Sequence, residues 1–168
     1  FGGSQWALGY DNLREVAWPG LAVFAEQAWS GEAAEPATVE ARHQQAFHGH
    51  PLPGLTRLRR LLVEGLSISS RRACELHTLP APGWVRLAAT GRLPSARALA
   101  ADLERLGAAR RDLAACRRTA RRHRDHLDLY GLAIERMAAT LLRAIAARTP
   151  SAASCRRAVA ALRRSRAV

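Results

Sequence analysis

The stretch from residue 126 to residue 149, HLDLYGLAIERMAATLLRAIAART, has the clearest periodic pattern in the chain. Its large apolar side chains recur every three or four residues, so they share one face of a helix. They are Leu127, Tyr130, Ile134, Met137, Leu141 and Ile145. Because such a face must be buried against another element, we predict a long helix here. It packs most simply on the preceding helix, as an antiparallel hairpin.

The partner helix is predicted to begin after Ser95, because serine is a strong N-cap residue. Its apolar stripe consists of Leu99, Leu103, Leu106 and Leu113. After the hairpin, the sequence Thr149-Pro150-Ser151 ends the second helix, and a short last helix that frays at its end is predicted over residues 151–168.

Upstream of the hairpin, we predict one helix from Leu55 to about Leu76, with Gly65 and the serines that follow it as weak points. Residues 79–94, LPAPGWVRLAATGRLP, are predicted to be a connector. Within it, Trp84 is expected to fill a gap between helices.

Charge divides the chain into two parts. Residues 1–50 carry two arginines against six acids, a net charge of −4, and residues 51–168 carry 24 arginines against eight acids, a net charge of +16. The change falls at residues 48–54, HGHPLPG, where prolines and glycines interrupt the chain. We therefore predict a domain boundary there, with domains at residues 1–50 and 51–168.

The net charge of +12 and the isoelectric point near 11.5 would usually indicate a nucleic-acid or acidic partner. However, all 26 basic residues are arginine, and this exclusive use with abundant alanine is typical of a G+C-rich coding sequence. The basic residues at 117–124 also occur all round the predicted helix, which argues against nucleic-acid binding. The alternative kept open is a non-enzymatic, arginine-rich helical module that binds nucleic acid or a protein partner.

The helical part contains no convincing candidates for catalytic or metal-binding side chains. Glu104, Asp112 and Glu135 each have a neighbouring arginine and are expected to form solvated surface pairs. The histidines at residues 123–128 (HRDHLD) are not expected to bind a metal, because no distant third ligand is evident. Those at residues 43–50 (HQQAFHGH) lie in a polar segment and are expected to be surface side chains rather than ligands. We predict no metal and no cofactor.

Three widely spaced cysteines, Cys74, Cys116 and Cys155, argue against a disulfide framework. They favour a reducing compartment such as the cytoplasm and are expected to be buried or half-buried thiols. No apolar run reaches the roughly 18 residues of a membrane-spanning helix, so no membrane association is predicted.

In the first part, residues 1–8 are predicted to end a short strand. A helix from about Leu13 to Trp29 follows, which begins or kinks at Pro19. Residues 30–36 break it, and residues 37–49 form another short helix. This opening is expected to be the end of a larger enzyme domain whose earlier part lies outside the sequence.

Residues 2–31, GGSQWALGYDNLREVAWPGLAVFAEQAWSG, resemble the C-terminal end of the barrel in family 20 glycoside hydrolases, the β-N-acetylhexosaminidases. In these (β/α)₈ enzymes a tryptophan with a polar neighbour ends the last strand, and a helix containing PGLA and a terminal tryptophan closes the barrel. The resemblance implies a mainly α chain in which a remnant of the last strand and helix of a (β/α)₈ barrel precedes an arginine-rich helical domain. It also implies a missing N-terminal barrel portion.

The resemblance also implies a sugar subsite at the strand end, where barrel enzymes bind ligands. Its residues would be Trp6, Gln5, Tyr10 and Asp11, and its ligand an N-acetylhexosamine-containing glycan. The family's catalytic Asp-Glu pair is absent, because no DE dipeptide occurs in the chain. No catalytic residue is therefore assigned, and the expected function is that of an inactive C-terminal fragment of a hydrolase that removes terminal N-acetylhexosamine residues.

Overall fold

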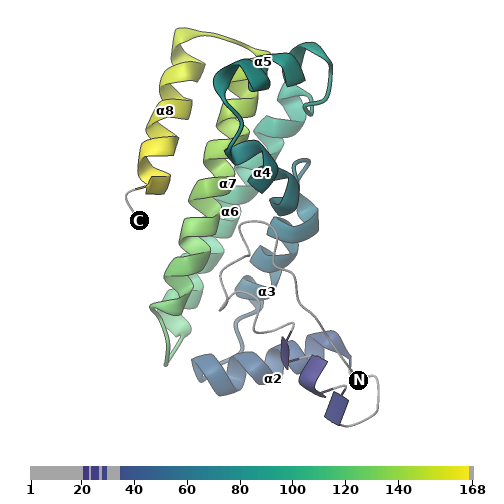
Figure 1. Cartoon of the computed structure of the whole chain (residues 1–168). Helices are drawn as coiled ribbons and strands as arrows, with labels where there is room; N and C mark the ends of the chain where they lie inside the picture. The colour runs from purple at the N-terminus through teal and green to yellow at the C-terminus, as the bar shows by residue number, and fades with distance from the viewer. Residues whose placement is uncertain (1–20, 23, 27, 30–34, 167–168) are drawn as a thin grey trace.

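The computed structural model describes residues 21–22, 24–26, 28–29 and 35–166, and these residues form helices and no strand (Figure 1). The predicted mainly α class is therefore confirmed. The strand predicted at residues 1–8 lies outside the described residues, and the barrel remnant stays a prediction.

Two long helices form the centre of the molecule, α6 (Ala96–Thr119) and α7 (His126–Arg148). They lie antiparallel and side by side, as the predicted hairpin requires (Figure 1). Ser95 caps α6, since its hydroxyl accepts a hydrogen bond from the Ala98 N–H at 3.1 Å. The predicted apolar faces meet between the two helices; their fully buried members include Leu99, Leu106, Leu127, Tyr130, Ile134, Met137 and Leu141.

The last helix, α8 (Ala152–Arg166), runs back along α7 (Figure 1). Ser151 and Ser154 fix its start, because the Ser154 N–H donates to the Ser151 hydroxyl at 3.0 Å. Ala158 and Ala161 are buried on its inner side. Small residues at these positions let α8 approach the hairpin closely.

The single helix predicted from Leu55 to Leu76 is wrong. The chain instead forms α3 (Pro53–Arg60), one π-helical turn, η1 (Leu61–Gly65), and α4 (Ser70–His77). Leu66 is extended after Gly65, and the Ser69 hydroxyl accepts from the Arg72 N–H at 3.3 Å, which starts a new helix. The weak points recognised in the sequence therefore break the helix completely.

The predicted connector at residues 79–94 contains a further helix, α5 (Ala81–Ala89). Pro82 lies in its first turn, where a missing N–H costs no hydrogen bond. Trp84 fills the space between α5 and α7 as expected, with 3% of its surface exposed. The guanidinium of Arg143, from α7, lies 4.7 Å from the centre of its ring.

The first complete helix, α2 (Pro36–His48), lies across the end of the molecule where α6 turns into α7 (Figure 1). The Glu35 carboxylate caps it by accepting from the Thr38 N–H at 2.8 Å, and these backbone contacts lower the pKa of Glu35. The helix ends at Gly49, whose φ of 72° is the left-handed conformation that glycine adopts without strain.

The predicted boundary at residues 48–54 coincides with the connection from α2 to α3. Across it, the buried Gln44 side chain donates to the Thr56 hydroxyl at 2.9 Å and accepts from the Leu52 N–H at 2.6 Å. These bonds attach the two helices to each other. Whether residues 1–50 and 51–168 are separate domains stays a prediction.

Arginine side chains hold several segment ends in place by donating to backbone carbonyls. Arg143 donates to the carbonyls of His77 and Leu79, at 3.2 and 2.8 Å. Arg105 donates to the Gly65 carbonyl at 2.9 Å, and Arg148 to the carbonyl of Leu93. Part of the positive charge is thus used inside the fold, at the ends of η1, α4 and α5.

Candidate functional site

The predicted sugar-binding residues Trp6, Gln5, Tyr10 and Asp11 lie outside the described residues. Their arrangement therefore stays a prediction. The described residues closest to them in sequence belong to the helix that the resemblance places at the end of the barrel.

That helix, in its described residues between 21 and 29, turns its apolar side outward. The apolar residues follow the spacing of one helical face, i, i+3, i+4, i+7 and i+8, and all five are exposed: Leu21, Phe24, Ala25, Ala28 and Trp29. Trp29 is 94% exposed, Phe24 45% and Leu21 43%. We call these five residues the outer stripe. An amphipathic helix normally buries such a face.

An exposed ion pair connects this helix to α2. The Glu26 carboxylate accepts from Arg42 of α2 at 3.2 Å. The charged side chain thus faces the rest of the protein while the outer stripe faces away from it.

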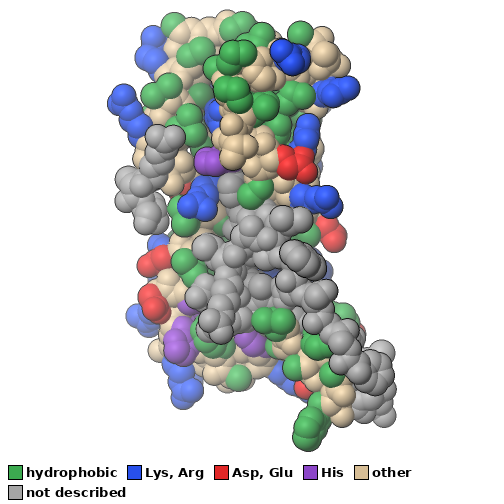
Figure 2. Space-filling view, viewed as in Figure 1, with side chains coloured by type: hydrophobic (Ala, Val, Ile, Leu, Met, Phe, Trp, Pro, Cys, Tyr) green, Lys and Arg blue, Asp and Glu red, His purple; other side chains and the backbone are tan. Residues whose placement is uncertain are grey.

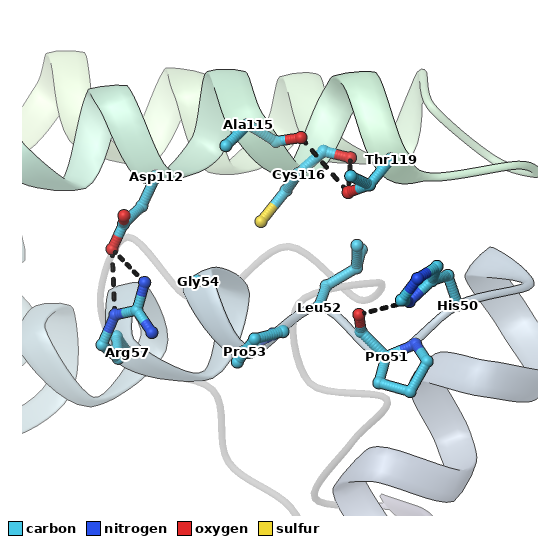
Figure 3. A pocket seen from close by; sticks show the side chains of 10 residues that line it. All are labelled: His50, Pro51, Leu52, Pro53, Gly54, Arg57, Asp112, Ala115, Cys116 and Thr119. Atoms are coloured by element: carbon cyan, nitrogen blue, oxygen red, sulfur yellow. Dashed lines mark hydrogen bonds and ion pairs between the residues drawn. The ribbon is translucent and has the colours of Figure 1, made fainter.

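A shallow pocket of about 310 Å³ lies between the start of α3 and the end of α6 (Figure 3). The Arg57 guanidinium and the Asp112 carboxylate form an ion pair of 3.1 Å at one end, and His50 lies at the other. Its lining also includes Pro51, Leu52, Pro53, Gly54, Ala115, Cys116 and Thr119. The surface of the pocket is mainly apolar, and the Asp112 carboxylate and the Arg57 guanidinium are already paired with each other.

The helices meet closely at the base of this pocket. A Cβ atom added at Gly54 would lie 3.1 Å from Cys116 Sγ and 3.3 Å from Asp112 Cβ, so glycine permits α3 to approach α6. Burial raises the pKa of the Cys116 thiol. Because the thiolate is the reactive form, this cysteine is suited to packing rather than nucleophilic attack.

The three cysteines are free, and they differ in exposure. Cys116 is buried and Cys74 half-buried, as expected, whereas Cys155 is exposed on α8. The prediction that all three are covered is therefore wrong for Cys155, because it lies on the outer side of α8, the last helix of the bundle.

The acids expected to pair with neighbouring arginines have other partners. Asp112 pairs with Arg57 of α3, and Glu135 pairs with Arg110 at 2.7 Å and Arg164 at 3.7 Å. These pairs join different helices, because adjacent residues on a helix point in different directions. Glu104 is exposed and forms no ion pair with the described residues.

Asp102 of α6, the one buried carboxylate among the described residues, was not predicted; it is 1% exposed. It accepts from the Ser67 N–H at 2.9 Å and from the Ser67 hydroxyl, and pairs with Arg105 at 3.3 Å. Its spacing of three residues after Leu99 and four before Leu106 places it on the buried stripe. That spacing was the signal that could have identified it.

The expectation that the histidines of residues 43–50 are surface side chains is wrong for His48, which is 1% exposed, and only partly right for the half-buried His43. Phe47 lies among four imidazoles, with ring centres 5.7 Å from His43, 4.9 Å from His48, 4.3 Å from His123 and 5.0 Å from His126. We call these five residues the histidine cluster. It joins α2 to the α6–α7 turn.

Burial and the neighbouring rings lower the pKa of His48 to about 4, opposed by a hydrogen bond with the Arg122 backbone. The pKa of His43 is also lowered, first by burial and then by the charge of Arg59. Among the residues that the structure describes, no three His, Cys, Asp or Glu side chains are placed to hold a metal ion. The histidine cluster is thus a set of packed rings, in which burial favours the neutral forms of His43 and His48.

No family model, curated protein or solved structure matches the chain. None of the helices in the described ranges is long and apolar enough to span a membrane.

Proposed function

We propose that this chain is the C-terminal part of a family 20-type glycoside hydrolase that removes terminal N-acetylhexosamine residues. In this proposal residues 1–50 form the C-terminal end of the barrel, and Trp6, Gln5, Tyr10 and Asp11 contribute to the sugar subsite. The helices from α3 to α8 are an appended structural unit, and the chain alone has no turnover because it lacks the Asp-Glu pair.

The observation that carries the proposal is the outer stripe. In a (β/α)₈ barrel, each helix presents an apolar face to the strands inside it. Leu21, Phe24 and Trp29 form such a face, and within the described residues nothing covers it. Figure 2 shows hydrophobic side chains at the surface at the lower right, at the end where α2 lies (Figure 1).

The free energy of burying apolar side chains also favours a partner surface that would cover the outer stripe. Burying a large aromatic or aliphatic side chain contributes about 1.5–3 kcal/mol, so three exposed ones leave several kcal/mol unrealised. A spacing that gathers them on one face indicates a specific partner rather than chance exposure. The proposal assigns that partner to the earlier strands of the same barrel.

The decisive experiment is to determine the coding sequence upstream of Phe1 and to express the longer product. We expect further strand–helix units with an adjacent Asp-Glu pair, and hydrolysis of an aryl N-acetyl-β-hexosaminide. The 168-residue chain should show no turnover. A start codon close to Phe1, or turnover by the short chain that survives Trp6→Ala, would overturn the proposal.

The outer stripe can be tested separately in both proteins. Trp29→Asp should destabilise the longer product, and in the 168-residue chain it should reduce self-association measured by light scattering. Val85→Asp is the matched control, since Val85 is 61% exposed on α5, apart from the outer stripe. Equal effects of the two substitutions would show that the outer stripe has no specific partner.

The arginine-rich module is the second candidate, and α8 is the observation that favours it. This helix contains five arginines and no acid: Arg156, Arg157, Arg163, Arg164 and Arg166. A salt titration with random DNA decides, because binding through phosphates gives a steep loss of affinity with salt. Tight, steeply salt-dependent binding would favour this candidate, and negligible binding would remove it.

A further inference from the structure

The histidine cluster lies where α2 is attached to the rest of the protein. The His48 carbonyl, at the end of α2, accepts from the backbone N–H groups of Arg121 and Arg122 at 2.9 and 3.2 Å. The His48 ring also makes a hydrogen bond with the Arg122 backbone, while its Nδ1 is buried without a hydrogen-bond partner. His48 therefore attaches α2 to the α6–α7 turn, while Gln44 and Glu40 attach it to α3.

The remaining contacts of the cluster come from both sides of the same junction. Phe47 and His43 belong to α2, whereas His123 lies in the α6–α7 turn and His126 at the start of α7. Ring stacking holds them together, with His123 nearly parallel to Phe47 at an interplanar angle of 15°. His123 has a φ of 49°, which is uncommon for a residue other than glycine. It lies in the tight α6–α7 turn, and its ring stacks on Phe47.

We propose that this junction is an acid-sensitive docking site: α2 stays docked while the imidazoles of His43 and His48 are neutral, and detaches as they gain protons. The regulated event is local, because α6, α7 and α8 hold together through apolar faces that contain no histidine other than His126.

The charges around the junction would not stabilise imidazolium ions. The groups that act electrostatically on His48 are the rings of His126, His43 and His123, and each of them lowers its pKa. Those acting on His43 are Arg59, His126 and Glu40. Glu40 is the one carboxylate among them, and it is already held by Arg59 at 2.9 Å.

The other groups near the junction do not change this balance. The turn itself carries Arg121, Arg122 and Arg124, and its carboxylate, Asp125, is exposed and does not act on the His43 or His48 ring. Tyr130, whose ring centre lies 5.8 Å from that of His126, is neutral throughout the acid range. Protonation thus adds positive charges to a buried, already basic junction.

The direction of the pH effect follows from linkage. A detached α2 exposes its histidines, which then titrate near their ordinary pKa of 6.5, whereas burial lowers the pKa values of His43 and His48 while α2 is docked. The detached form therefore binds protons first as the pH falls. Docking is strongest above pH 6.5 and is lost progressively toward pH 4.

Hydrogen exchange of the full 168-residue chain tests this inference. Protection factors, corrected for the intrinsic rate, are compared between pH 7.5 and pH 5.0 for amides of α2 and of the α6 interior. Each proton taken up on detachment lowers protection about tenfold per pH unit, so α2 should lose about tenfold or more. The α6 amides should change by less than about threefold.

Two variants separate a pH effect from simple loss of packing. His43→Gln removes a half-buried ionisable ring whose pKa is lowered by burial, so α2 should remain docked at pH 7.5 and lose less protection at pH 5.0. The double variant His43→Gln, His48→Gln should show the weakest pH response relative to its own value at pH 7.5. His77→Gln, an exposed histidine on α4, is the matched control and should behave as the parent protein.

The inference is overturned if α2 keeps its protection at pH 5.0, or if α2 and α6 lose protection together, which is ordinary acid unfolding. An unchanged pH response in the double variant would also overturn it. None of these outcomes depends on the proposed glycosidase function, because no residue involved belongs to the proposed sugar subsite.

Discussion

The Asp102 carboxylate of α6 accepts hydrogen bonds from both the backbone N–H and the hydroxyl of Ser67, just beyond the π-helical turn η1. Arg105, one turn further along α6, pairs with the same carboxylate and donates to the Gly65 carbonyl. One helix thus holds both sides of the break between η1 and α4. The buried Asp102 carboxylate, through its three polar contacts, replaces backbone hydrogen bonds that are lost where the helix is interrupted.

Asp102→Ala should therefore lower the free energy of unfolding by about 3 kcal/mol, because it leaves the Ser67 N–H and hydroxyl without their acceptor. Urea denaturation followed by circular dichroism measures the change. Glu104→Ala is the control and should stay within about 0.5 kcal/mol, since that side chain is exposed. Similar losses in both variants would contradict the role of Asp102.

Gly54→Ala should destabilise the protein by about 1 kcal/mol, because the added Cβ meets Cys116 Sγ and Asp112 in the contact between α3 and α6. Gly107→Ala is the matched control. Nothing lies within 4 Å of a Cβ at that α6 position, so alanine should stabilise by up to about 1 kcal/mol through its helix propensity. Thermal unfolding compares the two, and stabilisation by both would show that the contact is loose.

Tyr130→Phe should stabilise the protein at neutral pH by about 1 kcal/mol, since the Tyr130 hydroxyl is buried without a hydrogen-bond partner in the described chain. Burial also raises the pKa of Tyr130 to about 12. The unfolded chain loses this proton first, so the parent protein loses stability as the pH rises from 10 to 12. Urea unfolding across this range should show a smaller loss for Tyr130→Phe than for the parent, and parallel curves would contradict the assignment.

The thiols should react with Ellman's reagent at pH 8 in the order of their exposure. Cys155 should react at once, Cys74 more slowly, and Cys116 on the order of a hundredfold more slowly still, because its thiol is buried and its pKa raised. Cys155→Ser should remove the fast phase and leave the others unchanged. A fast phase that survives this substitution would show that Cys116 or Cys74 is accessible.

The sequence was sufficient where large apolar residues repeat with a helical period. Leu127 and its successors identified α7, and Ser95 marked the start of α6, because periodicity and capping are local properties. Local signals also explain the two errors in the fold. Ser69 caps a helix as Ser95 does, and it marks the start of α4. Pro82 lies in the first turn of a helix rather than in a connector, and it marks the start of α5.

The functional features depended on contacts that no local pattern contains. His48 is buried at the α6–α7 junction, distant in sequence, where the ring of His126 lies 5.6 Å from its own, centre to centre. Likewise, the partners of Asp112 and Glu135 come from other helices. The outer stripe is the converse case, since its spacing was visible in the sequence but its exposure was not.

The arginines that bind backbone carbonyls have a consequence for how this sequence can change over time. Arg143 serves two carbonyls and covers the ring of Trp84 simultaneously, which requires a planar group with several donors. A lysine ammonium cannot reproduce that combination. Once nucleotide composition has placed arginine at such positions, reversion to lysine loses stability, so a neutral drift toward arginine becomes a one-way step.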